Sequence, residues 1–478
     1  MKRLHVFSLI CGFYLVALGV MSGQTWTPLN NQASFNASTA LLLTDGRVLV
    51  QAMNASNWWT LTPDLTGSYL NGTWTQVATL PKGYAPLFYA SAVLPDGRVI
   101  VMGGEDNLGV GDWTTLGAIY DPVSDIWRNL NAPSGWTTVG DAQSVILADG
   151  TFMVANCCTT DQALLNAKKL TWTPTGKGKA DENDEEAWTL LPSGEVLTVD
   201  VNLGKSLSSE IYNPATGSWS SAGSTVVELV NVPAFEIGPA VLRPDGTVLY
   251  TGAKGHNAIY NSLTGIWSAA PDFPKGHGGQ LDIADGPAAL LTNGNVLCMT
   301  SPGVYNYGVV FFEWDGANFN ETVNIPRSLS DSSYMGRMLV LPTGQIMLTD
   351  GSTDVELYTP GGSPNPSWAP AITKFAKTLV HGKASILSGT QLNGLSQGAA
   401  YGDDAQSATN YPLIRITNNA TGHVFYARTY KPTSMGVATG STIVKSHFAI
   451  PVGIELGASQ LEVVANGIPS NPVSVMIQ

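Results

Sequence analysis

Cysteine is scarce in this chain, with 4 residues among 478. Cys11 lies in an N-terminal apolar segment that we expect to be removed, which leaves Cys157, Cys158 and Cys298. Three cysteines cannot all pair within one molecule, so the sequence excludes a dense disulfide framework. A chain of this length buries enough apolar surface to fold without one.

Charged residues are also few, at 12% of the chain, and basic residues are the scarcer kind. The formal net charge is -13 at pH 7, and it becomes about -15 once the two basic residues near the N-terminus are removed. An acidic surface repels nucleic acid, so we expect no nucleic-acid partner. Such a surface is compatible with cations and with neutral ligands such as sugars.

Long apolar runs are absent except near the N-terminus, where the run from Leu4 to Val20 follows Lys2 and Arg3. A basic start, an apolar stretch and small residues after it are typical of a secretory signal. We therefore predict a cleaved signal peptide over residues 1–23 and a mature protein that is secreted or exposed at the cell envelope. No other segment has the length of a membrane-spanning helix, so no membrane span is expected after cleavage.

Glycine and proline are abundant, at 51 and 28 residues, and they separate many short apolar runs. Strand–turn–strand patterns such as ALLLTDGRVLV and AVLRPDGTVLYTG recur along the chain. Asp-Gly turns favour two-residue hairpins, because both central residues need positive φ. The turn glycines recur every 44 to 53 residues, at Gly46, Gly97, Gly150, Gly194, Gly246, Gly294 and Gly344. This repeat predicts an all-β fold with a seven-bladed kelch-type β-propeller over residues 24–358.

Segments between the hairpins, such as IYDPVSDIW and IYNPATGSW, supply the outer strands of the predicted blades. One further strand at Trp26 or another at Trp368 would complete the last blade, and the sequence leaves both alternatives open. Residues 359–370 are rich in Pro and Gly and are expected to form a linker. Strand-length apolar segments in residues 371–478 predict an immunoglobulin-like β-sandwich.

A kelch-type propeller followed by such a sandwich resembles the galactose oxidase superfamily, and most closely its exported bacterial kelch-repeat members. The resemblance covers the whole mature chain and implies a fold rather than an activity. Copper radical oxidases of this superfamily bind one copper ion with two tyrosines and two histidines. One of those tyrosines is crosslinked to a cysteine.

The residues at the corresponding positions of this chain do not preserve the copper site. Tyr334 occupies the tyrosine position of a Tyr-His pair, but Met335 replaces the histidine, and Asp141 stands where the crosslinked tyrosine is expected. The segment PLFYASAV has no cysteine, and ARTYKPTSMG, with Tyr430, corresponds approximately to the histidine-bearing loop of the sandwich. Copper of this type needs imidazole ligands. We therefore expect neither bound copper nor copper radical oxidase activity.

Another group of residues is predicted to meet at one mouth of the propeller channel, because its members stand shortly before the turn glycines. They are Tyr89, Asp141, Glu185, Glu186, Glu236, Asp285, Tyr334 and Arg337. Converging carboxylates are costly unless they bind a cation, share protons or are solvated. Three interpretations stay open: a Ca²⁺ site, a carbohydrate or polyol site with Tyr89 and Tyr334 as apolar platforms, and a solvated rim without a ligand.

Cys157 and Cys158 follow the second strand of the third hairpin. Adjacent cysteines can join in a strained disulfide ring, which an oxidising compartment would permit. The alternative is a pair of reduced thiols packed beneath the loop. Cys298 lies in an apolar strand and is expected to be a small core residue.

These features together predict an exported binding or interaction module that takes a carbohydrate or a cell-surface partner. The rival class is an enzyme, either an extracellular oxidoreductase built around Tyr334 or a carbohydrate-active enzyme that uses two carboxylates at the mouth. The sequence requires no cofactor, and Ca²⁺ is the ion that the carboxylates would suit.

Overall fold

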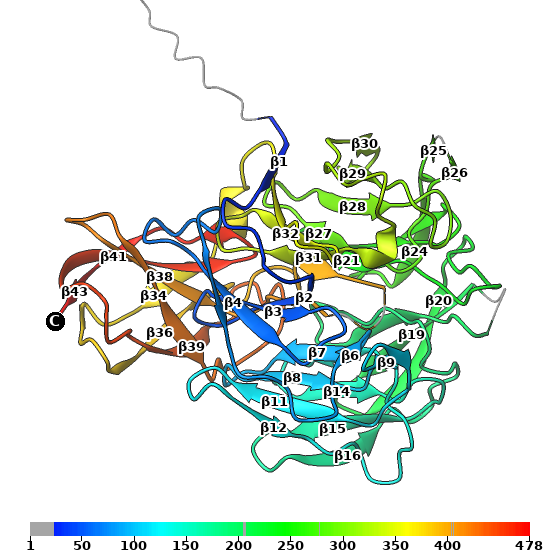
Figure 1. Ribbon diagram of the computed structural model, residues 1–478, viewed down its shortest axis with the longest axis horizontal. Helices are drawn as coiled ribbons and strands as arrows, with labels where there is room; N and C mark the ends of the chain where they lie inside the picture. The colour runs from blue at the N-terminus through cyan, green and yellow to red at the C-terminus, as the bar shows by residue number, and fades with distance from the viewer. Residues whose placement is uncertain (1–22, 204–206, 277, 403, 405) are drawn as a thin grey trace, which may run out of the picture.

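The computed structural model describes residues 23–203, 207–276, 278–402, 404 and 406–478 (Figure 1). Apart from Gly23, the predicted signal peptide lies outside the described residues. The described part of the chain is all-β, as predicted, and its helical segments are two short 3-10 turns, Ser333–Met335 and Pro366–Trp368. No helix of this part is long and apolar enough to cross a membrane.

Most strands of the described residues form small antiparallel sheets whose strands follow one another in chain order. The first sheet consists of β2 (Ala37–Leu42), β3 (Val48–Ala52), β4 (Trp58–Thr62) and β5 (Thr73–Gln76). The second consists of β7 (Ala90–Val93), β8 (Val99–Met102), β11 (Gly117–Asp121) and β12 (Ile126–Asn129). The third consists of β13 (Ser144–Ile146), β14 (Phe152–Ala155), β15 (Gln162–Asn166) and β16 (Thr171–Thr175). The fourth sheet consists of β17 (Thr189–Leu190), β18 (Val196–Val199), β19 (Ser208–Asn213) and β20 (Ser218–Ser224). The fifth consists of β21 (Ala240–Leu242), β22 (Thr247–Thr251), β23 (Asn257–Asn261) and β24 (Ile266–Ala270).

Two further sheets contain strands from distant parts of the chain. The sixth consists of β27 (Ala288–Leu290), β28 (Val296–Thr300), β29 (Val310–Trp314) and β30 (Phe319–Glu321), with β37 (Ala399–Ala400) added beside β27. The seventh consists of β31 (Arg337–Val340), β32 (Ile346–Thr349), β33 (Glu356–Thr359) and β1 (Thr25–Pro28). Smaller pairings join β6 (Pro86–Leu87), β9 (Asp106–Asn107) and β10 (Val110–Gly111), and β25 (Lys275–Gly276) with β26 (Gly279–Gln280).

These sheets are arranged in a closed, propeller-like ring. The first strands of consecutive sheets contact one another in chain order, and β31 contacts β2. The strand that completes the last sheet is β1, in which Trp26 is paired with Tyr358. The Trp26 ring packs on Phe311 and Tyr358, with ring centroids 4.9 and 5.0 Å apart. Of the two alternatives that the sequence leaves open, the strand at Trp26 therefore closes the ring, whereas Trp368 lies in a 3-10 turn.

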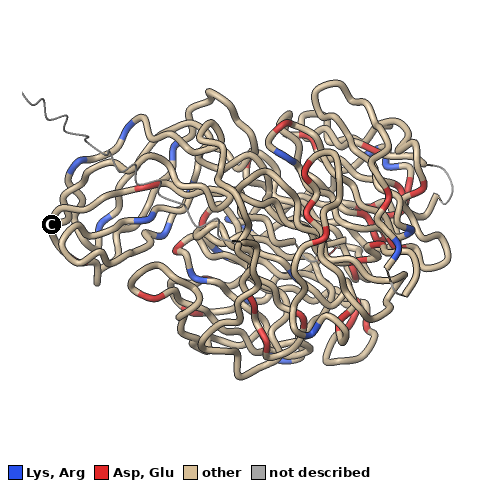
Figure 2. Tube along the Cα trace, turned by 90° about the horizontal axis from the view of Figure 1, so that it is seen from above, with Lys and Arg blue, Asp and Glu red and all other residues tan. Residues whose placement is uncertain are grey.

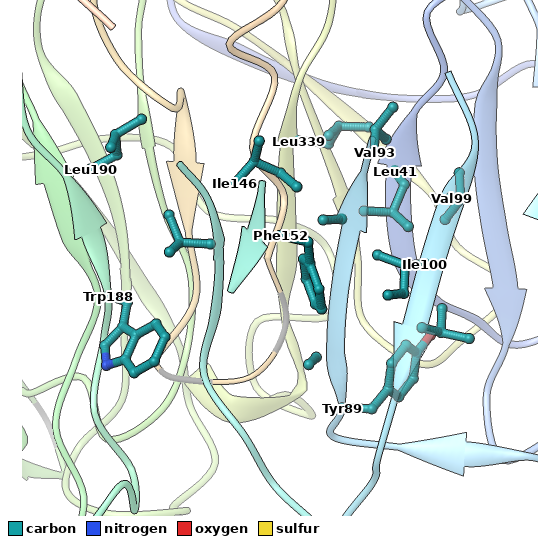
Figure 3. Close-up of a cluster of buried hydrophobic side chains, with 14 of the residues drawn as sticks. Leu41, Tyr89, Val93, Val99, Ile100, Ile146, Phe152, Trp188, Leu190 and Leu339 are labelled. Carbon is teal, nitrogen blue, oxygen red and sulfur yellow. The ribbon is translucent and has the colours of Figure 1, made fainter. Parts of the chain in front are cut away.

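The hairpins lie where the sequence predicts them, but the turn at Gly46 is not the expected two-residue type, because Gly46 has positive φ and the preceding Asp45 does not. Gly46 adopts φ 80° at its turn, and its N–H donates to the carbonyl of Leu43. Neighbouring sheets cover both faces of the innermost strands, so all six residues of β2 are buried. Figure 3 shows the result, with Leu41, Ile146 and Leu339 from three innermost strands in one apolar cluster.

Residues 371–478 form a second β-unit with a curled nine-stranded sheet. Its strands are β34 (Ala371–Lys374), β35 (Thr378–Leu379), β36 (Ala384–Thr390), β38 (Leu413–Asn418), β39 (Val424–Tyr430), β40 (Val444–Ala449), β41 (Gly457–Ala465), β42 (Ile468–Pro469) and β43 (Val473–Ile477). This unit lies against the hairpin turns of the ring, where Tyr426 packs on Gly46 and Gly467 on Gly344. The end of the ring that carries the turns is therefore covered. The opposite end, where the innermost strands begin, is called the mouth below.

One connection of the second unit enters the channel of the ring. Residues 391–412 join β36 to β38 and include β37, which pairs with β27. The side chain of Gln397 accepts a 2.8 Å hydrogen bond from the N–H of Leu190 in the fourth sheet. Further along, the Tyr401 hydroxyl donates to the carbonyl of Tyr334 at 2.7 Å. The connection therefore passes through the ring and reaches the mouth.

The two parts of the molecule differ in charge. Residues 24–370 carry 32 acidic and 14 basic residues, whereas residues 371–478 carry 4 acidic and 7 basic residues. Figure 2 shows the acidic positions gathered in the ring and basic positions spread over the C-terminal unit. The negative charge inferred from composition is thus concentrated in the part that contains the mouth.

Candidate functional site

The structure brings three of the predicted carboxylates together at the mouth. One oxygen from each of Glu185, Glu236 and Asp285 lies within 4.8 Å of the others. The residues precede β17, β21 and β27, so they come from three consecutive sheets. Glu185 and Asp285 each stand nine residues before a turn glycine, and both adopt positive φ, 56° and 46°. The same local turn therefore aims both side chains toward the axis.

Two carboxylates of this cluster, Glu236 and Asp285, are in hydrogen-bond contact. Burial raises the pKa of Asp285 well above its ordinary value, and the neighbouring Glu236 and Asp404 raise it further. A hydrogen bond between Asp285 and Glu236 contributes in the same direction. Like charges at this separation cannot both be ionised cheaply, so these surroundings favour the protonated form of Asp285. The hydrogen-bonded pair therefore places carboxyl oxygens at the mouth.

Two tyrosines stand beside the carboxylates. The Tyr305 hydroxyl donates to Oε1 of Glu236. The rings of Tyr305 and Tyr334 meet edge to face, with centroids 5.4 Å apart. Tyr305 comes from the connection between β28 and β29, and its side chain is 46% exposed. The cluster therefore combines carboxylates with an accessible aromatic surface.

Exposed aromatic side chains concentrate at this end of the molecule. The most exposed among the described residues are Trp113, Phe235, Tyr305 and Tyr307. Each lies in a connection between the second and third strands of one sheet or between consecutive sheets. Because strands alternate in direction, both kinds of connection lie at the mouth. The hairpin end carries none of these four residues.

A buried arginine supports the floor of the site. Arg337 donates to the carbonyls of Tyr334 and Gly336 at 2.7 and 2.9 Å. Its guanidinium lies 3.7 Å from the ring centroid of Tyr401, a residue of the connection that enters the channel. Asp404 of the same connection is 1% exposed and raises the pKa of Asp285. The C-terminal unit therefore completes a site whose other residues come from the ring.

Three of the predicted site residues, Tyr89, Asp141 and Glu186, lie outside the mouth cluster of Glu185, Glu236 and Asp285. Tyr89 is fully buried in the core shown in Figure 3, and its hydroxyl donates to Gln51 at 2.6 Å. It is therefore not an accessible platform, because the innermost strands close over it. Asp141 is also buried, at 7% exposure, and it contributes to a raised pKa of the Cys157 thiol.

Glu186 is held in a separate ion-pair network. Its carboxylate lies 2.7 Å from Nζ of Lys179, which also pairs with Glu210 at 2.6 Å. Burial raises the pKa of Glu186 to about 8, although Lys179 opposes the shift. Its backbone precedes β17 as predicted, but its side chain is fully buried beside Lys179 and is not part of the cluster that contains Glu185.

Among the residues that the structure describes, those near Tyr334 do not fit the copper site implied by the resemblance. Tyr334 lies beside the ring of Tyr305 and is followed by Met335. Its backbone carbonyl accepts hydrogen bonds from the side chains of Arg337 and Tyr401. Among the described histidines, His256 pairs with Asp272 and His423 with Glu455. A set of carboxylate and phenol oxygens suits a hard cation better than copper.

The alignment of the C-terminal unit with the oxidases needs correction. Tyr430 stacks on His447, with centroids 5.5 Å apart, and Arg428 lies over its ring. It belongs to β39, on the covered end of the ring. The segment that reaches the mouth is instead the connection of residues 391–412. Sequence reasoning missed Tyr401 and Asp404 because no repeat places this connection relative to the ring.

Comparisons with known proteins support the fold. No family model and no curated protein matches the chain. A fungal alcohol oxidase of the AA5 family, solved with copper, has a TM-score of 0.53 and 14% identity, and the match covers 95% of this chain and 99% of that chain. The extracellular domain of a hybrid two-component system from B. thetaiotaomicron has a TM-score of 0.49 and 10% identity, covering 96% of this chain and 59% of that chain. The chain thus shares an all-β, propeller-like fold with the oxidase, and at this identity the likeness concerns the fold alone.

Proposed function

We propose that the protein is an exported binding module that takes a carbohydrate or a similar polyhydroxylated ligand at the mouth. The architecture proposed with it is a seven-bladed kelch-type β-propeller over residues 24–358, a linker over 359–370 and an immunoglobulin-like sandwich over 371–478. The observation that carries the proposal is the contact of accessible Tyr305 with Glu236, which is hydrogen-bonded to Asp285.

The chemistry of the mouth matches that of a sugar. A pyranose ring has apolar C–H faces and a rim of hydroxyls, so it is complementary to an aromatic face bordered by hydrogen-bonding groups. Tyr305 and Tyr307 offer exposed rings, and the carboxyl oxygens beside Tyr305 offer hydrogen-bond acceptors. A neutral ligand also avoids the repulsion that an anion would meet at this acidic end.

Backbone strain supports a functional role for the same residues. Phe88, Glu185, Phe235, Asp285 and Tyr305 all adopt positive φ, between 46° and 61°. Each such non-glycine residue costs on the order of 1 kcal/mol, and strain of this kind clusters at ligand sites. Three of these residues, Glu185, Asp285 and Tyr305, belong to the mouth cluster, which supports a site held in shape by the surrounding ring.

The test is a glycan array probed with labelled mature protein, followed by calorimetry with the best-bound sugar. Tyr305→Ala is expected to weaken binding at least about tenfold, because it removes both the stacking face and the Glu236 contact. Tyr305→Phe keeps the ring and should lose less. Tyr430→Ala, on the covered end, is the control and should bind as the unmodified protein does. Absence of binding to every sugar of the array would refute the proposal.

A carbohydrate-active enzyme is the second candidate, and the three carboxylates of the mouth favour it. Glycoside cleavage uses one carboxyl as an acid and a second one, across the scissile bond, as nucleophile or base. Release of reducing ends from the bound sugar, lost in Asp285→Asn with binding retained, would establish this function. Elemental analysis of the same samples shows whether Ca²⁺ accompanies the carboxylates.

A further inference from the structure

Cys157 and Cys158 lie in the connection that follows β14, beside the mouth. Their Sγ atoms are 2.7 Å apart. Cys158 adopts φ 66°, a left-handed conformation that is unusual for a residue with a side chain. The turn therefore directs two consecutive side chains toward each other, whereas consecutive residues of a strand point to opposite faces.

Backbone hydrogen bonds from two neighbouring segments hold this turn. The N–H of Cys157 donates to the carbonyl of Val139 at 3.0 Å, and the N–H of Cys158 donates to the carbonyl of Asn183 at 2.8 Å. Cys157 is buried, while Cys158 is half-buried. The pair is thus fixed by the ring and open to a reagent on one side.

We propose that Cys157 and Cys158 are joined by a disulfide bond in the exported protein, formed by exchange with the disulfide of a thiol oxidoreductase. Two S–H bonds are lost and one S–S bond forms, while two protons and two electrons reduce the disulfide of the oxidoreductase to a dithiol. The half-buried Cys158 is the sulfur that the oxidoreductase reaches first, which gives a mixed disulfide. Cys157 then attacks the sulfur of Cys158, and the oxidoreductase leaves as a thiol.

The surroundings of the two sulfurs are acidic. Both sulfurs face Oδ1 of Asp184, at 3.7 and 3.5 Å. The hydrogen bond with Cys158 and burial raise the pKa of the Cys157 thiol, and Asp141 and Asp184 raise it further. A Cys157 thiolate beside these carboxylates is therefore disfavoured, whereas a disulfide carries no charge.

Bond formation also changes the mouth. It removes the two S–H groups that face Asp184, so this carboxylate loses its contacts with the thiols and is released for a ligand or water. The sulfur pair then presents an apolar surface. A Cβ at position Gly140 would lie 3.2 Å from Cys157 Cβ and 3.6 Å from the exposed Trp113 ring, so the pair and the indole lie close to one another.

The proposal is tested by mass spectrometry of protein exported into an oxidising compartment, unfolded and alkylated before digestion. The peptide of residues 129–168, released after Arg128 and Lys168, is expected without alkyl groups and two hydrogens lighter than the dithiol. Prior reduction should add two alkyl groups. Cys298 is fully buried in another core cluster and should be alkylated without reduction, as an internal control.

Two variants make the result decisive. Cys157→Ser leaves Cys158 without its partner, so Cys158 should become reactive to alkylation in the folded protein without a reductant. Cys298→Ser should leave the mass of the 129–168 peptide unchanged. Alkylation of both Cys157 and Cys158 in the unreduced exported protein, or a crosslinked peptide containing Cys298, would overturn the proposal.

Discussion

Individual buried carboxylates carry much of the chemistry of this molecule, and several lie outside the mouth. Glu356 in β33 is 3% exposed, and neither of its carboxylate oxygens has a hydrogen-bond partner among the described residues. Burial raises its pKa to about 7, with further contributions from Asp354, Asp350 and Asp331. A single side chain of this kind makes stability depend on pH.

The sign of that dependence follows from proton uptake. In the unfolded chain a glutamate titrates near about 4.3, so between that pH and about 7 the folded protein binds a proton that the unfolded chain does not. The stabilisation is full below the unfolded pKa and is lost as pH rises through 7. Glu356→Gln should therefore raise the free energy of unfolding at pH 8 by on the order of 2 kcal/mol, with little change at pH 4.

Melting temperatures of both proteins between pH 4 and 8 measure this effect. Glu321→Gln, at an exposed position of β30, is the matched control and should leave the pH profile unchanged. Parallel profiles for Glu356→Gln and the unmodified protein would show that the pKa of Glu356 does not change on folding.

Among the elements, strand β1 has four residues and yet completes the last sheet of the ring. It is distant in sequence from the rest of the seventh sheet, and its pairing with β33 joins the two ends of the ring. Closure removes a sheet edge that would otherwise be exposed. The Nε1–H of Trp26 donates a 2.9 Å hydrogen bond to the carbonyl of Val323, which follows β30 of the neighbouring sheet.

Trp26→Ala should lower the free energy of unfolding by about 2 to 3 kcal/mol, because it removes the ring that packs on Phe311 and Tyr358. Denaturant unfolding followed by fluorescence measures the loss. Trp113→Ala removes an exposed indole and serves as the control, with an expected change below about 0.5 kcal/mol. Equal losses in the two variants would mean that β1 does not secure the ring.

At the scale of the whole molecule, the ring and the C-terminal unit are held in close contact. A Cβ at position Gly467 would lie 2.6 Å from Cα of Gly344, the turn glycine of the last hairpin. Both glycines have positive φ, 72° and 81°. The same unit sends Tyr401 and Asp404 to the mouth, so its position against the turns also fixes the floor of the site.

Gly467→Ala should therefore destabilise the protein by about 3 kcal/mol, of which about 1 kcal/mol is backbone strain. Gly135→Ala isolates the strain, because Gly135 has φ 89° and a Cβ there would meet no atom within 4 Å. Scanning calorimetry of the two variants gives the difference. If Gly135→Ala costs as much as Gly467→Ala, the contact between the two units contributes nothing measurable.

Much of the fold could be predicted because local sequence patterns determine where the strands and turns lie. Turn glycines and apolar strands locate the hairpins, since positive φ and burial are requirements of single residues and their neighbours. The same register placed Glu185, Glu236 and Asp285 at one end of the ring. It also placed Tyr89 and Glu186 there, because the spacing from a turn glycine gives the position of a residue along its strand and not the direction of its side chain.

The sequence by itself determined the all-β class, the repeat and the acidic character of the ring, since these depend on composition and short-range spacing. Only the tertiary structure decided that Trp26 closes the ring, that Tyr305 meets Glu236, and that Tyr401 and Asp404 reach the mouth. Each of these contacts joins residues far apart in the chain. Their proximity is set by how whole sheets pack, because close packing selects a single arrangement that no local pattern specifies.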